Sequence, residues 1–369
     1  MKTKTYTSGG LTAAGLLALS LVSAPGAHPL SNPGYMQVNL VSDLATNAPH
    51  VDPRLVNPWG IVAGPESVWV NDNGTGLTTS YAELGHAFDF AIHIPAPGGG
   101  PGAPSGLVFN ETRQFVISNA TKHAASTFLM ATEDGTITAW NQTITRSNAV
   151  IVAAISNAVY KGLAIADDTN GTPQLYAANF HAGTVDVFDS QFHYLTSFTD
   201  ADVPALFAPF NLLNVRGKLF VAFAKQRLPD MHDDLSGPGN GYIDVFDTDG
   251  TLLRRFAAQG PLNSPWGMAV APRNFGKFSD ALLVGNFGDG RINAYDLLTG
   301  KWLGPLTDLN GVPLFISGLW GLAFDREPVF EQECNFQAER LYFTAGLNGE
   351  ADGLLGFIRP AQTAFPHAH

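Results

Sequence analysis

The stretch Ser264-Pro265-Trp266-Gly267-Met268 belongs to a turn motif that recurs along the chain before short apolar segments. The other copies are Asn57-Pro58-Trp59-Gly60-Ile61, Ala103-Pro104-Ser105-Gly106-Leu107, Val159-Tyr160-Lys161-Gly162-Leu163, Ala208-Pro209-Phe210-Asn211-Leu212 and Gly318-Leu319-Trp320-Gly321-Leu322. Successive landmarks, from Gly60 to Gly321, are 46, 56, 49, 56 and 54 residues apart. This period is close to the ~40–50 residues of a four-stranded propeller blade.

The order of segments within a copy also indicates a blade. In the third copy, the apolar segments Leu163–Ala166 and Leu175–Ala178 precede the alternating segment Thr184–Phe188. Dipeptides suited to tight hairpin turns separate such segments, because their second residue tolerates a positive φ. They are Asp134-Gly135, Ala182-Gly183, Asn240-Gly241, Asp289-Gly290 and Asp352-Gly353.

The last copy, Leu319–Ile358, holds only three such segments, and Met36–Val41 is a free β-like segment that would supply the fourth. Pairing the two ends closes the ring and removes exposed sheet edges. We therefore predict an all-β, six-bladed propeller of four-stranded blades. It is a single domain over residues 28–360, with blades starting near 57, 103, 159, 208, 264 and 318 and a tail over 361–369. An open stack of sheets or a pair of β-sandwiches would not explain six copies in phase.

Composition narrows the class of protein and its partners. Only 14% of the 369 residues are charged, and the chain has 39 glycines and 24 prolines, which excludes a coiled coil, a disordered chain and a helical repeat array. The formal charge is −12, and no run of Lys or Arg could follow a phosphate backbone. We expect no nucleic-acid or membrane partner, and a monomer.

The N-terminus has the features of a secretory signal peptide. Lys2 and Lys4 precede the apolar run 11–22, and small residues around Ala24 and Ala27 offer cleavage sites. We predict a signal peptide over residues 1–27 and a secreted, extracellular protein. Cys334 is the single cysteine, so no intrachain disulfide is expected. Glycosylation sequons occur at Asn73, Asn110, Asn119, Asn141 and Asn170.

Several strings resemble an exported propeller family of bacteria and fungi. They are Tyr160-Lys161-Gly162-Leu163-Ala164, Leu175-Tyr176-Ala177-Ala178-Asn179-Phe180, Asp186-Val187-Phe188-Asp189, Pro265-Trp266-Gly267, Leu283-Val284-Gly285-Asn286-Phe287-Gly288-Asp289-Gly290 and Leu341-Tyr342-Phe343-Thr344-Ala345-Gly346. The resemblance extends from Val38 to Ile358 and implies a six-bladed, NHL-like propeller. Some bacterial members of that family end in a cell-envelope sorting tag, which this chain does not carry. The resemblance implies a fold and no particular activity.

In a propeller, the loops that lead into the innermost strands and those that follow the second strands meet at one mouth of the central channel, where ligands bind. Trp59, Trp266 and Trp320 fall at one repeat position there and would form an aromatic rim that contacts substrate. The same residues would alternatively wedge between neighbouring sheets. Asn211, Asn179 and Asn286 would orient substrate oxygens or bond to hairpin backbone.

Lys161 is the one cation among these six repeat positions, so it needs either a salt-bridge partner or a catalytic task. His181 follows the second strand of its blade and is suited to acid–base work, although a solvated loop histidine is the plainer interpretation. A long insertion, 225–240, carries His232 beside Asp233 and Asp234, could fold over the mouth as a lid and could bind a cation.

A divalent cation is an open alternative, because propellers of the lactonase type hold one in the channel with Glu, Asp and Asn side chains. Oxygen ligands of this kind suit Ca²⁺. The residues that would hold calcium are Asn211, Asn179, Asn286, Asp134 and Asp289. No Glu stands at a landmark, and no serine-hydrolase elbow or zincin motif occurs.

These features predict a secreted propeller that binds a small organic molecule at the channel mouth and transforms it as a hydrolase, lyase or isomerase. Lys161 would polarise the substrate and His181 would transfer a proton. The alternative is a non-catalytic propeller that binds a glycan, a peptide or an envelope partner.

Overall fold

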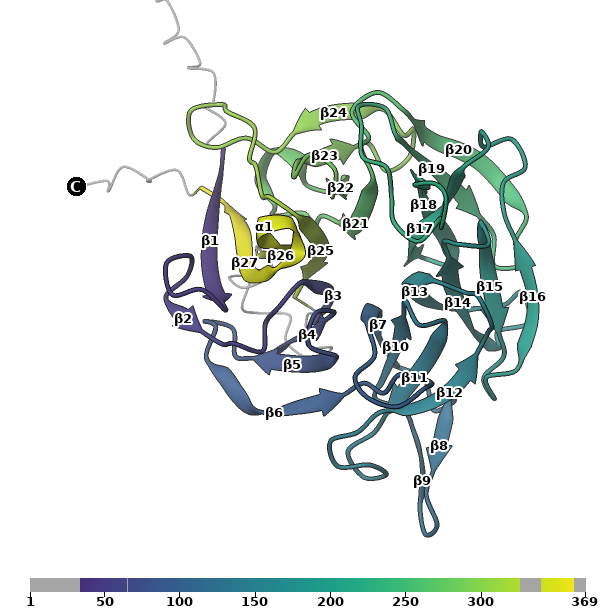
Figure 1. Ribbon diagram of the computed structural model, residues 1–369. Helices are drawn as coiled ribbons and strands as arrows, with labels where there is room; N and C mark the ends of the chain where they lie inside the picture. Colours follow the sequence, from purple (N-terminus) through teal and green to yellow (C-terminus); the bar gives the residue numbers. More distant parts are fainter. Residues whose placement is uncertain (1–33, 65, 326–339, 362–369) are drawn as a thin grey trace, which may run out of the picture. The chain divides into compact units, whose positions relative to one another are not determined.

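The computed structural model describes residues 34–64, 66–325 and 340–361, which form the six sheets of a β-propeller (Figure 1). The expected signal peptide, Cys334 and the tail from 362 lie outside the described residues. No helix in the described ranges is both long and apolar enough to cross a membrane.

Each blade is an antiparallel sheet whose first strand lies innermost and contacts the first strands of its neighbours. The innermost strands are β3 (Pro58–Ala63), β7 (Pro104–Phe109), β13 (Tyr160–Asp167), β17 (Phe207–Val215), β21 (Pro265–Val270) and β25 (Leu319–Phe324). The second strands are β4 (Val68–Asp72), β10 (Phe128–Thr132), β14 (Pro173–Asn179), β18 (Lys218–Lys225), β22 (Leu282–Asn286) and β26 (Leu341–Gly346). The third strands are β5 (Leu77–Tyr81), β11 (Thr136–Trp140), β15 (Thr184–Phe188), β19 (Gly241–Phe246), β23 (Ile292–Tyr295) and β27 (Asp352–Pro360).

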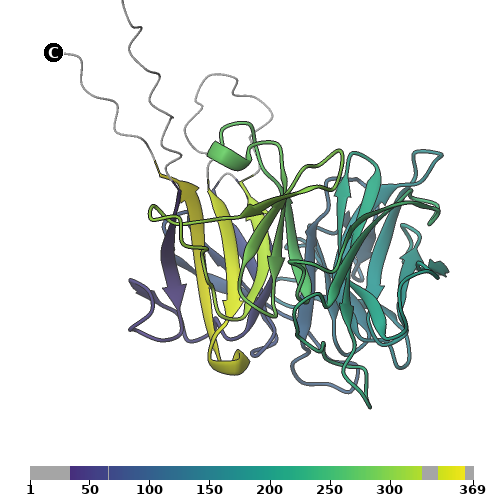
Figure 2. The ribbon, with the colours of Figure 1, turned by 90° about the horizontal axis from the view of Figure 1, so that it is seen from above.

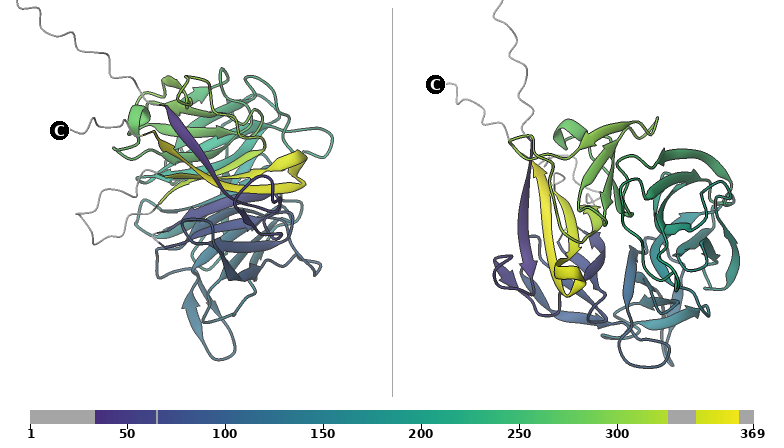
Figure 3. Two further views of the ribbon diagram at one scale, coloured as in Figure 1. Left: turned by 90° about the vertical axis from the view of Figure 1, so that its left-hand side faces the viewer. Right: turned by 45° about the horizontal axis from the view of Figure 1, so that its top comes forward.

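The outermost strands of the first five blades are β6 (Ala87–His93), β12 (Val150–Ala154), β16 (Tyr194–Phe198), β20 (Leu252–Ala258) and β24 (Trp302–Pro305). The sixth blade is completed from the other end of the chain. Its outer strand β1 (Tyr35–Ser42) runs antiparallel to β27, with Tyr35 opposite Pro360 and Ser42 opposite Leu354 (Figure 3). A short strand β2 (His50–Val51) extends this sheet. The predicted fold class and the predicted ring closure are confirmed.

A hairpin and two helical turns in the described part of the chain lie outside the repeat. The hairpin β8 (Val116–Ser118) and β9 (His123–Ala125) is inserted between the first two strands of blade two and projects from the ring (Figure 1). The helical turns α1 (Leu347–Glu350) and η1 (Gly276–Phe278) lie on opposite faces (Figure 2). We call the face that carries α1 the mouth face.

Two of the expected turn glycines do not have a positive φ. Gly241 is already the first residue of β19, and Gly239, two residues earlier, has the positive φ. Gly353 lies inside β27, and the turn before it places Asn348, Gly349 and Glu350 at positive φ. The hairpin turns therefore begin earlier than the Asn-Gly and Asp-Gly dipeptides indicated.

Glycines at the landmarks let the innermost strands approach one another closely. A Cβ at Gly60 would lie 2.4 Å from the backbone oxygen of Ser105, and one at Gly321 would lie 2.5 Å from that of Trp59. Hydrogen bonds join the blades at the same level: Thr344 Oγ1 donates to Trp59 O, and Asn71 Nδ2 donates to Ser105 O. The landmark glycine is thus a packing requirement of the ring.

We expect Gly321→Ala to destabilise the protein by about 1–3 kcal/mol, because the added methyl group would meet backbone atoms that cannot move independently. Urea unfolding measures the loss. Gly98→Ala is the control, because nothing lies within 4 Å of its Cβ position and its φ is not positive. Equal stability of the two variants would contradict the role given to the landmark glycine.

Candidate functional site

The three tryptophans of the repeat position form a packed plug and not an open rim. Trp59 stacks on Trp320 with ring centroids 3.6 Å apart, and Trp266 meets both rings edge-on at 5.8 and 5.7 Å. Phe210 and Phe287 also contact Trp320, so the cluster closes the axis of the ring. The tryptophans are 1–3% exposed, which leaves no space for a substrate between them. The expectation of a substrate held between these rings is corrected on this point.

Behind the plug, the innermost strands enclose a channel of about 300 Å³. Its lining is mostly aliphatic and includes Leu107, Leu163, Met268 and Leu322. The charged side chains near the axis lie on the opposite side of the plug from this channel, at the mouth face.

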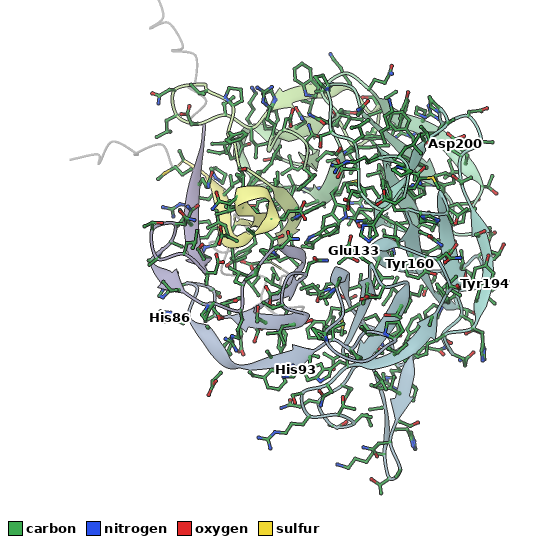
Figure 4. The ribbon with its side chains drawn as sticks, in the orientation of Figure 1. His86, His93, Glu133, Tyr160, Tyr194 and Asp200 are labelled. Carbon is green, nitrogen blue, oxygen red and sulfur yellow. The ribbon has the colours of Figure 1, made fainter. Side chains whose placement is uncertain are left out.

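Lys161 has a partner across a blade boundary. Its Nζ is bonded to Oε1 of Glu133, which lies in the loop after the second strand of blade two, toward the centre of the ring (Figure 4). The same ammonium lies 4.9 Å from the ring centroid of Trp59, a cation–π contact. The Lys161 side chain is 2% exposed and that of Glu133 is 11% exposed, so this is a largely desolvated ion pair.

Amide side chains extend this pair to a second carboxylate. Asn73 Nδ2 donates to Glu133 Oε2 at 2.8 Å, and Asn57 Nδ2 donates to Glu350 Oε2 at 2.9 Å and to Asn73 Oδ1 at 3.4 Å. The indole N–H of Trp320 donates to Asn57 Oδ1 at 3.2 Å. Blades one, two, three and six thus contribute to one polar network above the aromatic plug.

The insertion of blade four reaches this network. His232 Nδ1 lies 3.0 Å from Asp233 Oδ1 and 3.9 Å from Glu133 Oε1. Asp234 turns away and accepts hydrogen bonds from Ser236 and Ser264. The segment 225–240 therefore brings a histidine and a carboxylate to the mouth.

The pKa values of two carboxyl groups at the mouth are shifted in opposite directions from their ordinary values. Burial raises the pKa of Glu350, and the negative charges of Glu133 and Asp233 add to this effect. The hydrogen bond from His232 lowers the pKa of Asp233. The same bond raises the pKa of His232. Oppositely shifted groups in one site are typical of acid–base chemistry.

His181 does not take part in these interactions. Its Nδ1 lies 3.0 Å from the carbonyl oxygen of Asp230, and its own carbonyl accepts a bond from Gln226. It therefore helps to hold the insertion. Its neighbour Phe180 points inward and packs on Phe210 at 4.9 Å.

The asparagines and aspartates that were expected to hold calcium are bonded mostly to nearby backbone atoms. Asn211 donates to Trp266 O, and Asn179 accepts from Ala182 N and donates to Asp186. Asn286 donates to Pro261 O and to Asp289, while Asp134 accepts from Ala103 N. Among the described residues, only Asn286 and Asp289 of this set are bonded to each other.

Among the described residues, Glu133, His232 and Asp233 could place ligand atoms around a cation, because these atoms all lie within 4.8 Å of one another. The Lys161 ammonium already neutralises Glu133 in this group. A divalent cation bound there would be repelled by that ammonium.

Asn57, Asn73, Glu133 and Glu350 were not among the site residues predicted from the sequence. Glu133 directly precedes Asp134, which was selected, and nothing in the sequence says which of the two acids points inward. The unmatched Lys161 was the usable indication, because a buried ammonium requires a nearby carboxylate.

No protein-family model matches the chain. Over 364 residues the chain is 33% identical to uncharacterized protein R648 of Acanthamoeba polyphaga mimivirus, covering 94% of this chain and 87% of the relative. It is 35% identical over 336 residues to uncharacterized protein L690 of the same virus, covering 88% and 86%. The chain belongs to the family of these viral proteins. Membership of an exported family of bacteria and fungi stays a prediction.

Solved structures of similar fold include a catalytically inactive virginiamycin B lyase from Staphylococcus aureus with quinupristin. It is 11% identical, covers 88% of this chain and 98% of its own, and has a TM-score of 0.48. A luciferin-regenerating enzyme is 13% identical, with coverages of 83% and 92% and a TM-score of 0.49. The similarity is to the propeller fold and says nothing about the activity of this family.

We expect Lys161→Met to destabilise the protein by about 3–5 kcal/mol, because it leaves the Glu133 carboxylate largely buried without its cation. The double variant Lys161→Met/Glu133→Gln should recover much of this loss. Urea unfolding of both single variants and the double variant measures the coupling. Additive losses would show that the two groups do not interact in solution.

Stability should also depend on the proton of Glu350. The pKa of Glu350 is raised above its ordinary value of 4.5, so the folded state binds the proton on this carboxyl more tightly than the unfolded state does. The stability that this proton contributes to the folded state is lost as pH rises through the folded-state pKa. Glu350→Gln keeps an acceptor for Asn57 but cannot ionise. Relative to wild type, this variant should gain stability as pH rises from 4.5 to 8, measured by urea unfolding at each pH. A parallel pH dependence in the two proteins would contradict the assignment.

Proposed function

We propose that the protein binds a small organic molecule at the mouth face and transforms it by proton transfer, as a hydrolase, lyase or isomerase. One observation carries the proposal. Carboxyl groups whose pKa values are shifted in opposite directions, Glu350 and Asp233, belong to one mouth together with the buried Lys161–Glu133 pair. Carboxyl groups with oppositely shifted pKa values in one mouth provide the separate acid and base that proton-transfer chemistry uses.

Each of the ionisable residues at the mouth has a role in the proposed proton transfer. Glu350 retains its proton to higher pH than an ordinary glutamate and acts as the general acid. Asp233 remains ionised and pairs with His232, so this pair accepts a proton from substrate. The Lys161 ammonium provides a fixed positive charge that stabilises an oxyanion developing nearby. The tryptophan plug forms the floor of the site.

This assignment changes the roles expected from sequence. Lys161 keeps its polarising role, and His232 replaces His181 as the proton-transfer histidine, because His181 is bonded to the carbonyl oxygen of Asp230. Asn57 and Asn73 replace the more distant asparagines as the amides that orient carboxyl groups.

We also propose that the protein is exported and acts as a monomer. Lys2, Lys4, the apolar run 11–22 and the small residues that follow support export. The proposal further includes an NHL-like relationship, which rests on the six-bladed repeat.

The test uses a library of small esters, lactones, amides and hydroxy acids, screened first for a rise in Tm and then for turnover by mass spectrometry. We expect wild type to convert at least one compound, and Glu350→Gln and His232→Asn to lose about 10²–10⁴-fold in kcat. His193→Gln is the matched control and should retain activity, because the His193 side chain is 76% exposed and pairs with Asp189 of its own blade. Turnover that survives in Glu350→Gln, or that is lost in His193→Gln, would contradict the assignment.

Non-catalytic binding at the same mouth is the second candidate. The aromatic plug favours it, because the plug closes the channel as a route for a deeply bound substrate. Compounds that raise Tm without being converted, and whose effect disappears in Lys161→Met/Glu133→Gln, would identify this function.

A further inference from the structure

A second hollow lies far from the mouth, between blades one and two. It has a volume of about 470 Å³, within the ~300–1,000 Å³ typical of small-molecule pockets. Its walls include Trp69, Phe88 and Phe90 of blade one and Phe128 and Trp140 of blade two. We call it the aromatic groove.

The groove is lined by aromatic rings that support one another. Trp69 lies 4.9 Å from Phe128 and 6.0 Å from Trp140, and Phe90 lies 5.8 Å from Trp140. Phe128 and Trp140 are buried, Trp69 and Phe90 are partly buried, and Phe88 is 43% exposed at the edge. The rings thus form a fixed platform that is open on one side.

Aromatic rings cover two other blade boundaries at the corresponding end. Between blades two and three, Phe115 of the inserted segment packs on Phe192 at 5.7 Å, and both are buried. Between blades five and six, Phe275 and Phe278 beside η1 pack on Tyr35. The connection from β3 to β4 is short, since β3 ends at Ala63 and β4 begins at Val68, and it supplies no such aromatic cover. The aromatic groove is therefore a departure from the repeat.

Polar groups surround the aromatic platform. Glu66 and Gln142 are exposed at the rim, and Ser67, Ser80 and Thr127 add hydroxyl groups. Trp69 Nε1 donates to Ser67 Oγ at 3.0 Å, which fixes the indole plane. A carboxylate, an amide and hydroxyls around aromatic faces suit a ligand that is apolar on its faces and rich in hydroxyl groups at its edge.

We propose that the aromatic groove binds a carbohydrate. A pyranose ring presents C–H groups on its faces, which carry a small positive charge and are attracted to the negative π-face of an aromatic ring. Its equatorial hydroxyls lie at the edge, where Glu66, Ser67 and Gln142 can accept or donate hydrogen bonds. The site is independent of the proposed function and would attach the protein to a glycan while the mouth face stays free.

The test titrates the full chain with cellotriose, maltotriose and triacetylchitotriose by isothermal calorimetry. At least one should bind with millimolar or tighter affinity. Phe88→Ala should weaken that binding about tenfold, and Glu66→Gln should weaken it several-fold. Circular dichroism and Tm verify that the variants are folded. Phe88→Leu is a conservative second variant, because it removes the aromatic ring from a partly exposed position and keeps an apolar side chain there.

Phe315→Ala is the matched control, because Phe315 is 67% exposed and lies outside the groove. It should bind like wild type, as should Lys161→Met/Glu133→Gln. No binding of any of the three sugars would overturn the proposal. So would binding that Phe88→Ala leaves unchanged, or binding lost in the mouth variant, which would place the sugar at the mouth.

Discussion

The close approach of six innermost strands around one axis is the constraint on which the structure depends. A landmark glycine in five blades lets each strand lie against the backbone of the next, as Gly267 does against Trp320 and Gly321 against Trp59. Blade four has Asn211 instead, and its side chain bridges to Trp266 O. Neighbouring innermost strands thus meet through backbone contacts at the landmark glycines, and through the Asn211 side-chain amide where blade four meets blade five.

This packing determines which side chains meet at the axis. The residue before each landmark points into the ring, and five of the six are large: Trp59, Lys161, Phe210, Trp266 and Trp320. The sixth, Ser105, donates to Tyr160 O in the next blade. Together the large residues close the axis and exclude water beneath the mouth. The low dielectric of this plug strengthens the interaction between Lys161 and Glu133 and raises the pKa of Glu350.

The repeat could be predicted because its cause is local and periodic. The spacing of landmarks, the three-stranded last copy and the free segment near Met36 together determine the six blades and the closure by β1. The same periodicity favoured recurring asparagines as site residues. Asn179 and Asn286 both end the second strands of their blades, and both bond to nearby backbone and neighbouring side chains.

The site itself depends on details that break the repeat. Asp134 accepts a hydrogen bond from Ala103 N, whereas its neighbour Glu133 is paired with Lys161. The position of His232 depends on how the insertion folds across the mouth, which no periodicity encodes. A single unmatched residue, Lys161, was therefore more informative than any recurring one.

The charges at the mouth also connect ligand binding to proton transfer in the proposed function. Glu133 and Asp233 raise the pKa of Glu350, and Lys161 lowers it, so the proton on Glu350 responds to any charge added nearby. An anionic group bound beside Glu350 would raise its pKa further and keep it protonated as the acid. A cationic group would release that proton on binding. The acid role of Glu350 is therefore best served by a neutral or anionic substrate.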